Sequence, residues 1–109
     1  MRLLDGVRFA DSLAELNEAE RRQVPRIVAD VKRDYLDRAP EGYLDSDDNR
    51  QKAEAWAQAC AERQAVDGIN TQRYMRVKGI EGLTRFQESG RLAEALLTRQ
   101  LPKPPWDEG

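Results

Sequence analysis

The chain has 109 residues, a length that accommodates a single domain with one modest core. Its formal net charge of −2 gives no general attraction to nucleic acid or to an anionic membrane surface. It contains no histidine, the most usual general base and metal ligand, and its only cysteine, Cys60, excludes an internal disulfide and fits a reducing compartment.

The composition favours helix, because alanine, leucine, glutamate, glutamine and arginine dominate and runs of β-branched residues are absent. We therefore predict an all-α fold for residues 1–109, a small four-helix bundle and a single domain. An extended N-terminal arm (1–16) and an extended proline-rich C-terminal tail (102–109) flank the predicted helices.

The arm leaves two local alternatives open. Val7 and Phe9 flank Arg8 in the alternation of a strand, whereas Ser12-Leu13-Ala14-Glu15 has the pattern of a capping box that opens a helical turn. We expect Phe9 and its apolar neighbours to lie on the bundle. The N-terminal residues hold no apolar run long enough for a signal peptide and nothing approaches a membrane span, so the expected location is the cytoplasm, with no membrane contact.

The first clear helix is predicted over residues 24–39. Its apolar residues recur at helical spacing and form one stripe, made of Val24, Ile27, Val28, Val31 and Tyr35. Pro25 cannot lie deep in a continuous helix without the loss of a hydrogen bond, so it marks a start or a kink. Asn17-Glu18-Ala19-Glu20 is a second candidate for a capping box.

A helix junction is predicted at Asp67-Gly68-Ile69-Asn70-Thr71. The second helix runs from Ser46 or Asp47 to Asp67, with a small-residue inner face of Ala53, Trp56, Ala57, Cys60 and Ala61. Gly68 suits the left-handed position that ends a helix. Asn70 or Thr71 then caps the third helix, predicted from Thr71 to about Gln87.

The third helix is predicted to be the central element. Met75, Gly79, Gly82 and Phe86 share one sector, so the two glycines should permit close packing against the alanine face of the second helix. Val77 and Ile80 fall elsewhere on the helix, which predicts burial on most sides.

The fourth helix is predicted over residues 91–100, after Ser89-Gly90, and the prolines that follow should be extended. Residues 99–105 fit a basic-x-x-Pro-x-x-Pro ligand for aromatic grooves. The alternative, which we favour, is that the prolines stop the helix and Trp106 packs back onto the bundle.

Catalytic and metal sites find little support. Asp45-Ser46-Asp47-Asp48-Asn49 begins like a calcium loop, but Arg50 stands where the loop needs glycine and Trp56 where it needs glutamate. Cys60 lies among alanines and is expected to be a buried, structural thiol. No phosphate loop or serine nucleophile motif occurs. We therefore expect a non-enzymatic protein with no cofactor and no metal.

Basic residues of the third helix do not form one face. Lys78 and Arg85 share a strip with Glu81, whereas Arg73 and Arg76 lie on roughly the opposite side. This division argues against nucleic-acid binding. Protein contact is the remaining expectation, and the candidate protein-binding residues are Phe9, Arg73, Arg76 and Trp106.

Residues 56–86 contain a pattern made of Ala57, Ala61, Gly68-Ile69-Asn70-Thr71, Arg73-Tyr74, Gly82 and Phe86. In this pattern the segment resembles a group of small helical bacterial proteins encoded beside effectors of the type VI secretion system. The resemblance covers about a third of the chain, and the segment after Phe86 departs from the pattern. It implies a cytoplasmic adaptor or co-chaperone that helps to load a secreted effector.

Two functional hypotheses follow. The first is the protein-binding adaptor, whose partner is the effector or the effector's chaperone. The alternative is an immunity or antitoxin protein that inhibits a partner toxin by direct binding. An excess of acidic side chains on one surface would favour the inhibitor, whereas an apolar groove would favour the adaptor. Self-association into a homo-oligomer stays open.

Overall fold

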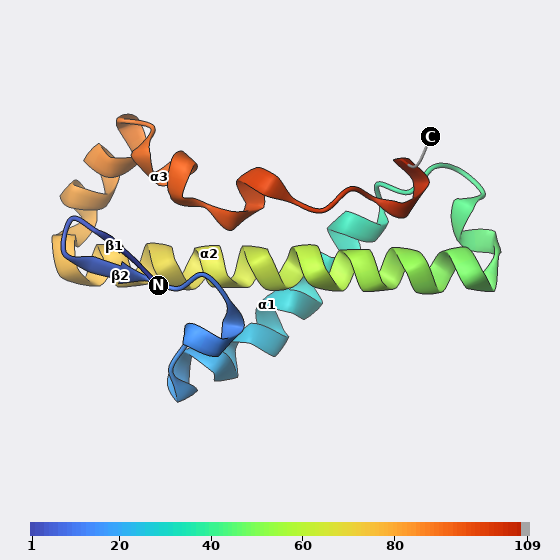
Figure 1. The fold of residues 1–109 in the computed structure, drawn as a ribbon, viewed down its shortest axis with the longest axis horizontal. Helices are drawn as coiled ribbons and strands as arrows, with labels where there is room; N and C mark the ends of the chain where they lie inside the picture. Colours follow the sequence, from blue (N-terminus) through green and yellow to red (C-terminus); the bar gives the residue numbers. More distant parts are fainter. Residues whose placement is uncertain (108–109) are drawn as a thin grey trace.

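The computed structural model describes residues 1–107, and 74% of it is helical. The helices are α1 (Glu18–Leu36), α2 (Asp47–Glu88) and the short α3 (Arg91–Ala95), and the hairpin strands are β1 (Arg2–Leu4) and β2 (Val7–Phe9). Single turns of 3₁₀ helix occupy Leu13–Glu15 (η1), Tyr43–Asp45 (η2), Leu97–Gln100 (η3) and Pro105–Asp107 (η4). The predicted helical character is confirmed, but the fold is not all-α, because β1 and β2 form a small two-stranded sheet, and the helices do not form a clear four-helix bundle. Instead, α2 spans the long axis of the molecule and the other segments lie against it (Figure 1).

The predicted junction at Gly68 is wrong, because α2 continues through it. Gly68 has helical backbone angles, and the hydroxyl of Thr71 donates to the carbonyl of Asp67 at 2.9 Å instead of capping a new helix. Val66 and Ile69, on either side of Gly68, are almost fully buried. Their packing outweighs the helix penalty of glycine, about 1 kcal/mol.

The break in α2 lies at Gly79 instead, where φ is 74° and ψ is 176°. The chain turns away from the long axis there (Figure 1). The turn brings Phe86 back onto Tyr74, with ring centroids 4.1 Å apart and planes 12° apart. In an uninterrupted helix, twelve residues would separate the two by about 18 Å.

The predicted burial of the third helix is therefore also wrong. Val77 is 62% exposed and Ile80 is 71% exposed. The alanine face of α2 packs against α1 instead, in a cluster that joins Ala57, Cys60 and Ala61 to Val28. Gly82 contacts no second helix; a Cβ there would meet the side chain of Lys78 one turn earlier.

Helix α1 begins six residues earlier than predicted. The capping box at Asn17 and Glu20 is confirmed: the Glu20 amide donates to Asn17 Oδ1 at 2.8 Å and the Asn17 amide donates to Glu20 Oε1 at 2.9 Å. Pro25 therefore lies inside the helix, where it is exposed and marks neither a start nor an end. The predicted apolar stripe faces α2, with Val24, Val28 and Tyr35 in the core.

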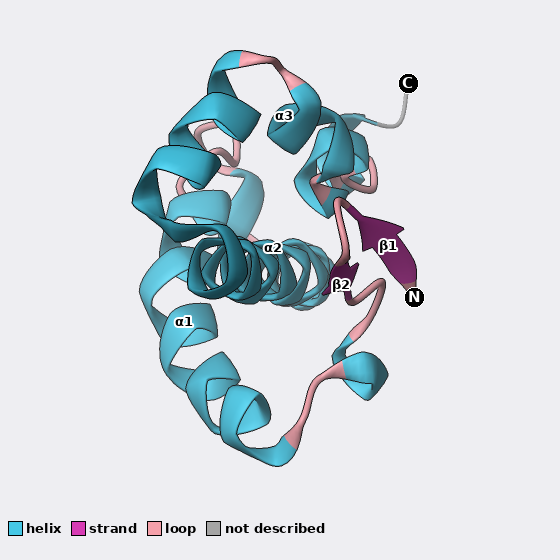
Figure 2. Ribbon diagram, turned by 90° about the vertical axis from the view of Figure 1, so that its left-hand side faces the viewer, coloured by secondary structure: helices cyan, strands magenta, loops and turns pink. Residues whose placement is uncertain are grey.

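The N-terminal arm resolves as a β-hairpin, so the strand alternative holds for residues 2–9. Leu4 pairs with Val7 across the turn, and Asp5 and Gly6 both have positive φ (51° and 81°), as a tight primed turn requires. Figure 2 shows the hairpin beside α2, on the side away from α1. Val7 and Phe9 point inward and join Tyr74, Leu83 and Phe86 in a second apolar cluster, separate from the α1–α2 core.

The C-terminal segment lies along α2. The predicted fourth helix is divided into α3 and η3, and residues 101–104 are extended. Trp106 packs edge-on against Trp56, with centroids 5.0 Å apart, and against Tyr43 at 5.5 Å, as the favoured alternative proposed. The indole nitrogen of Trp56 donates to the carbonyl of Pro102 at 2.7 Å. Residues 108 and 109 of the predicted tail lie outside the described residues.

Within residues 1–107, no helix has the length and apolar character needed to cross a membrane.

Candidate functional site

Three polar side chains on successive turns of α2 hold the segments that pack beside it. Asp67, Asn70 and Arg73 are spaced three residues apart, and each binds the backbone of a distant segment. The carboxylate of Asp67, which is buried, accepts from the amides of Leu97 at 2.6 Å and Thr98 at 2.9 Å. Asp67 thereby anchors the start of η3.

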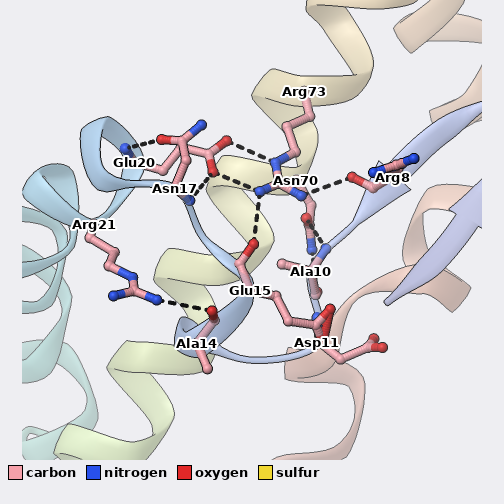
Figure 3. A network of polar contacts seen from close by, with 10 residues as sticks. All are labelled: Arg8, Ala10, Asp11, Ala14, Glu15, Asn17, Glu20, Arg21, Asn70 and Arg73. Carbon is pink, nitrogen blue, oxygen red and sulfur yellow. Dashed lines mark hydrogen bonds and ion pairs between the residues drawn. The ribbon is translucent and has the colours of Figure 1, made fainter.

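Asn70 holds the segment that follows the hairpin. Its Oδ1 accepts from the amide of Ala10 at 2.8 Å, and its Nδ2 donates to the carbonyl of the same residue at 2.9 Å. Asn70 is 1% exposed, so both backbone groups of Ala10 depend on this side chain rather than on water. Figure 3 shows the paired bonds between Asn70 and Ala10.

Arg73 joins three elements through one guanidinium (Figure 3). It forms a two-pronged ion pair with Glu20, with Nε to Oε2 at 2.8 Å and Nη2 to Oε1 at 2.6 Å. It also donates to the carbonyls of Arg8 at 3.0 Å and Glu15 at 3.2 Å. The guanidinium beside it holds the pKa of Glu20 below its ordinary value. The side chain of Arg73 is thus committed to joining β2, η1 and α1.

Asp5 connects the hairpin turn to the part of the chain beyond the kink. Its carboxylate accepts from the hydroxyl of Tyr74 at 3.0 Å and pairs with Arg91 at 2.8 Å. The charge and hydrogen bond of Arg91, and then the hydroxyl of Tyr74, lower the pKa of Asp5. Arg91 also lies over the ring of Phe86, 5.3 Å from its centroid. These contacts fix the position of the hairpin relative to the kinked end of α2.

Large exposed apolar side chains gather at this same end of the molecule. Within residues 1–107 they are found only on β1, at the N-terminus and on the part of α2 around Gly79: Met1 (59% exposed), Leu3 (67%), Met75 (40%), Val77 (62%) and Ile80 (71%). We call this the hairpin-end surface. A concentration of exposed apolar groups is typical of a surface that contacts another molecule.

Two hollows adjoin the hairpin-end surface. The first, of about 390 Å³, lies between the hairpin and α2 and is lined in part by Met1, Arg8, Arg76 and Val77. The second, of about 460 Å³, lies beyond the Asp5–Gly6 turn and has Tyr74 and Phe86 among its lining residues. Lys78, Arg85 and Arg91 also line the second hollow. Both hollows therefore combine apolar groups with several cationic side chains, and each also has one acidic residue in its lining, Glu20 in the first and Asp5 in the second.

The structure brings three of the four predicted protein-binding residues to the hairpin end. Phe9 is fully buried, Arg73 is tied to Glu20, and Arg76 is exposed beside the first hollow. Trp106 lies at the other end of α2, against Trp56 and Tyr43 (Figure 1). The role of each of these residues in binding stays a prediction.

The exposure of Val77 and Ile80, which were predicted to be buried, could not be read from the sequence. The same holds for the contacts that the polar residues of α2 make with distant segments. Gly79 was the available signal, since a glycine between two exposed apolar residues of a helix can place them on either side of a bend. The local sequence nevertheless favours a break at Gly68, because Asn70 and Thr71 follow it as apparent caps.

The described residues hold no cluster of three or more His, Cys, Asp or Glu side chains that could bind a metal ion. Cys60 is fully buried, and burial raises the pKa of its thiol. No family model, curated protein or solved structure matches the chain. Function is therefore argued from the hairpin-end surface and its surroundings.

Proposed function

We propose that the protein is a non-enzymatic adaptor that binds a protein partner through the hairpin-end surface. The observation that carries this proposal is the gathering of the exposed large apolar side chains at one end of the described chain. Val77 and Ile80 are the most exposed of those on α2, and Val77 lines the first hollow together with Arg73, which is bonded to Glu20. A preorganised apolar surface loses little conformational entropy on binding, which favours complex formation.

The proposed partner is a secreted effector of the type VI system, or the chaperone of such an effector. This part of the proposal is supported only by the resemblance of residues 56–86. Several residues of that resemblance, among them Asn70, Arg73, Tyr74 and Phe86, hold the hairpin in place. The adaptor or co-chaperone would act in the cytoplasm, before the effector is exported.

Inhibition of a toxin is the alternative function. An inhibitor of a cationic nuclease is expected to present an acidic surface. The hairpin-end surface instead carries Arg8, Arg76 and Lys78 beside its apolar side chains. This composition favours the adaptor, so the inhibitor is retained as an outcome of the test rather than as a second proposal.

Affinity capture from the lysate of the protein's own host, followed by mass spectrometry, tests the proposal. The tagged wild type is compared with a Val77→Asp/Ile80→Asp double variant and with an Ala29→Asp/Ala55→Asp control, in which exposed residues of α1 and α2 receive the same charges. We expect the wild type and the control to enrich a secreted effector or its chaperone, and the double variant to lose it.

Two results would contradict the proposal. Equal capture by the double variant would exclude the hairpin-end surface as the contact. Recovery of only a small toxin, whose activity the protein blocks, would support the immunity function instead.

A further inference from the structure

Three cationic side chains near the hairpin-end surface form no ion pair with any of residues 1–107. Arg8, Arg76 and Lys78 are exposed, and no carboxylate of residues 1–107 lies within ion-pair distance of them. By contrast, Arg73 and Arg91 at the same end are neutralised by Glu20 and Asp5. The unneutralised charges lie outside this framework, where a partner can reach them.

The only acidic side chain among residues 75–85 is Glu81, which is highly exposed and lies 3.8 Å from Arg85. The segment therefore carries a net positive charge beside Val77 and Ile80, although the chain as a whole has a net charge of −2. A local charge opposite in sign to that of the whole protein indicates a surface suited to an acidic partner.

The first hollow adds a constraint of shape. Its volume of about 390 Å³ lies beside exposed Met1 and Val77, with Arg8 and Arg76 among its lining residues. A large apolar side chain from a partner can enter such a hollow, while carboxylates next to it in the partner sequence reach the arginines. The hollow thus offers an apolar site for a partner side chain, with the cationic side chains of Arg8 and Arg76 beside it.

We infer that the hairpin-end surface binds an acidic segment of the partner protein that carries a large apolar side chain. This inference rests on the proposed adaptor function and specifies the chemistry that the adaptor recognises. The apolar side chain occupies the hollow beside Val77, and the acidic residues pair with Arg8 and Arg76, which line the same hollow. Lys78 lies about 200° from Arg76 around the helix axis and lines the second hollow instead.

A partner segment fits this surface better than an anionic membrane does. Met75 and Val77 lie two residues apart, which places them about 200° apart around the helix axis. A flat bilayer cannot contact both faces together, and it cannot fill a concave hollow. A peptide can follow the surface on both sides of Gly79 and insert a side chain into the hollow.

Selection of displayed random peptides on the immobilised full chain tests the inference. We expect the enriched peptides to share a net negative charge and at least one large apolar residue. Synthetic peptides from the enriched set should bind about tenfold more weakly to an Arg8→Glu/Arg76→Glu variant, in which both arginines of the first hollow are reversed. The control is Arg26→Glu/Arg33→Glu, which makes the same charge change at exposed positions on α1 and should bind as the wild type does.

Enrichment of neutral or basic peptides, enrichment of none, or equal binding by the Arg8→Glu/Arg76→Glu variant would overturn the inference. So would Val77-dependent cosedimentation with phosphatidylglycerol vesicles in the absence of peptide binding, since the surface would then contact lipid. Host capture separates the two proposals. If capture depends on Val77 and Ile80 but not on Arg8 and Arg76, the adaptor function stands and the inference of an acidic partner segment is wrong.

Discussion

Replacement of Gly79 by alanine is expected to destabilise the fold. At this position φ is 74° and ψ is 176°, a region that is essentially restricted to glycine, and holding a side-chain-bearing residue there costs about 1–3 kcal/mol. A Cβ built at Gly79 meets no other atom within 4 Å, so the cost arises from the backbone alone. The variant cannot escape it by straightening α2, because Phe86 would then leave its stacked position on Tyr74.

Gly68→Ala is the matched control in the same helix. Gly68 is exposed, has helical backbone angles and has open space around its Cα. Alanine there should raise the free energy of unfolding by up to about 1 kcal/mol. Urea denaturation followed by circular dichroism measures both variants, and thermal melts should show Tm shifts of about 4 °C per kcal/mol in opposite directions.

The pair of variants refutes the argument if the signs are reversed. A destabilised Gly68→Ala together with a neutral or stabilised Gly79→Ala would mean that α2 breaks at Gly68, as the sequence alone suggested. Destabilisation of both would mean that each glycine adopts a conformation that alanine cannot, and the continuous helix through Gly68 would be wrong.

Three further predictions concern the buried groups. Asn70→Ala should lower the free energy of unfolding by about 2–4 kcal/mol, because the amide and carbonyl of Ala10 lose their buried partners. Urea denaturation measures this change. A decrease in unfolding free energy smaller than that caused by a substitution at an exposed position would contradict the prediction. Since Arg73 lowers the pKa of Glu20 from its ordinary value of 4.5, the stabilisation from this carboxylate is present above pH 4.5 and is lost as the pH falls through the lowered pKa. The difference in unfolding free energy between wild type and Glu20→Gln should therefore shrink in acid, and a constant difference would show that the ion pair is not its source. The thiol of Cys60 should react with Ellman's reagent only after unfolding, and rapid reaction of the native protein would show that the thiol is accessible.

Features that depend on local sequence were predicted well. The stripe that ends at Tyr35 requires only the helical period, and the capping box at Asn17 and Glu20 requires only residues three apart. The alternation of Val7 and Phe9 indicated a strand as one of the two alternatives left open for the arm, and residues 7–9 form β2. In each case the residues that interact lie close together in the chain or share one periodic face, so the sequence contains the whole signal.

The position of the helix break, by contrast, could not be predicted from local sequence. Gly68 and Gly79 both interrupt helical segments, and the local sequence favours Gly68 because Asn70 and Thr71 follow it as apparent caps. What selects Gly79 is the packing of Phe86 against Tyr74 and the hairpin, a tertiary contact. Once the break lies there, Val77 and Ile80 flank a bend and become exposed.

The polar residues of α2 were also beyond local reasoning. Asn70 bonds to a residue 60 positions away, and Asp67 to one 30 positions away. Capping by Asn70 was the best local explanation for a polar side chain beside glycine. The actual partners are backbone groups of segments whose path is set by the whole fold, so no pattern within one helix could reveal them.

The backbone partners of Asn70 and Arg73 also separate stability from binding at the hairpin end. These side chains hold the carbonyls of Ala10 and Arg8, so they fix the path of the chain without constraining the outward side chains. Val77 is 62% exposed and contributes little to the core. Because valine and aspartate have similar helix propensities, Val77→Asp should change the free energy of unfolding by less than about 0.5 kcal/mol. Loss of partner capture by a variant that melts as the wild type does would therefore report a lost contact, whereas a strongly lowered Tm would show that Val77 supports the fold and that its exposure is no evidence for a binding surface.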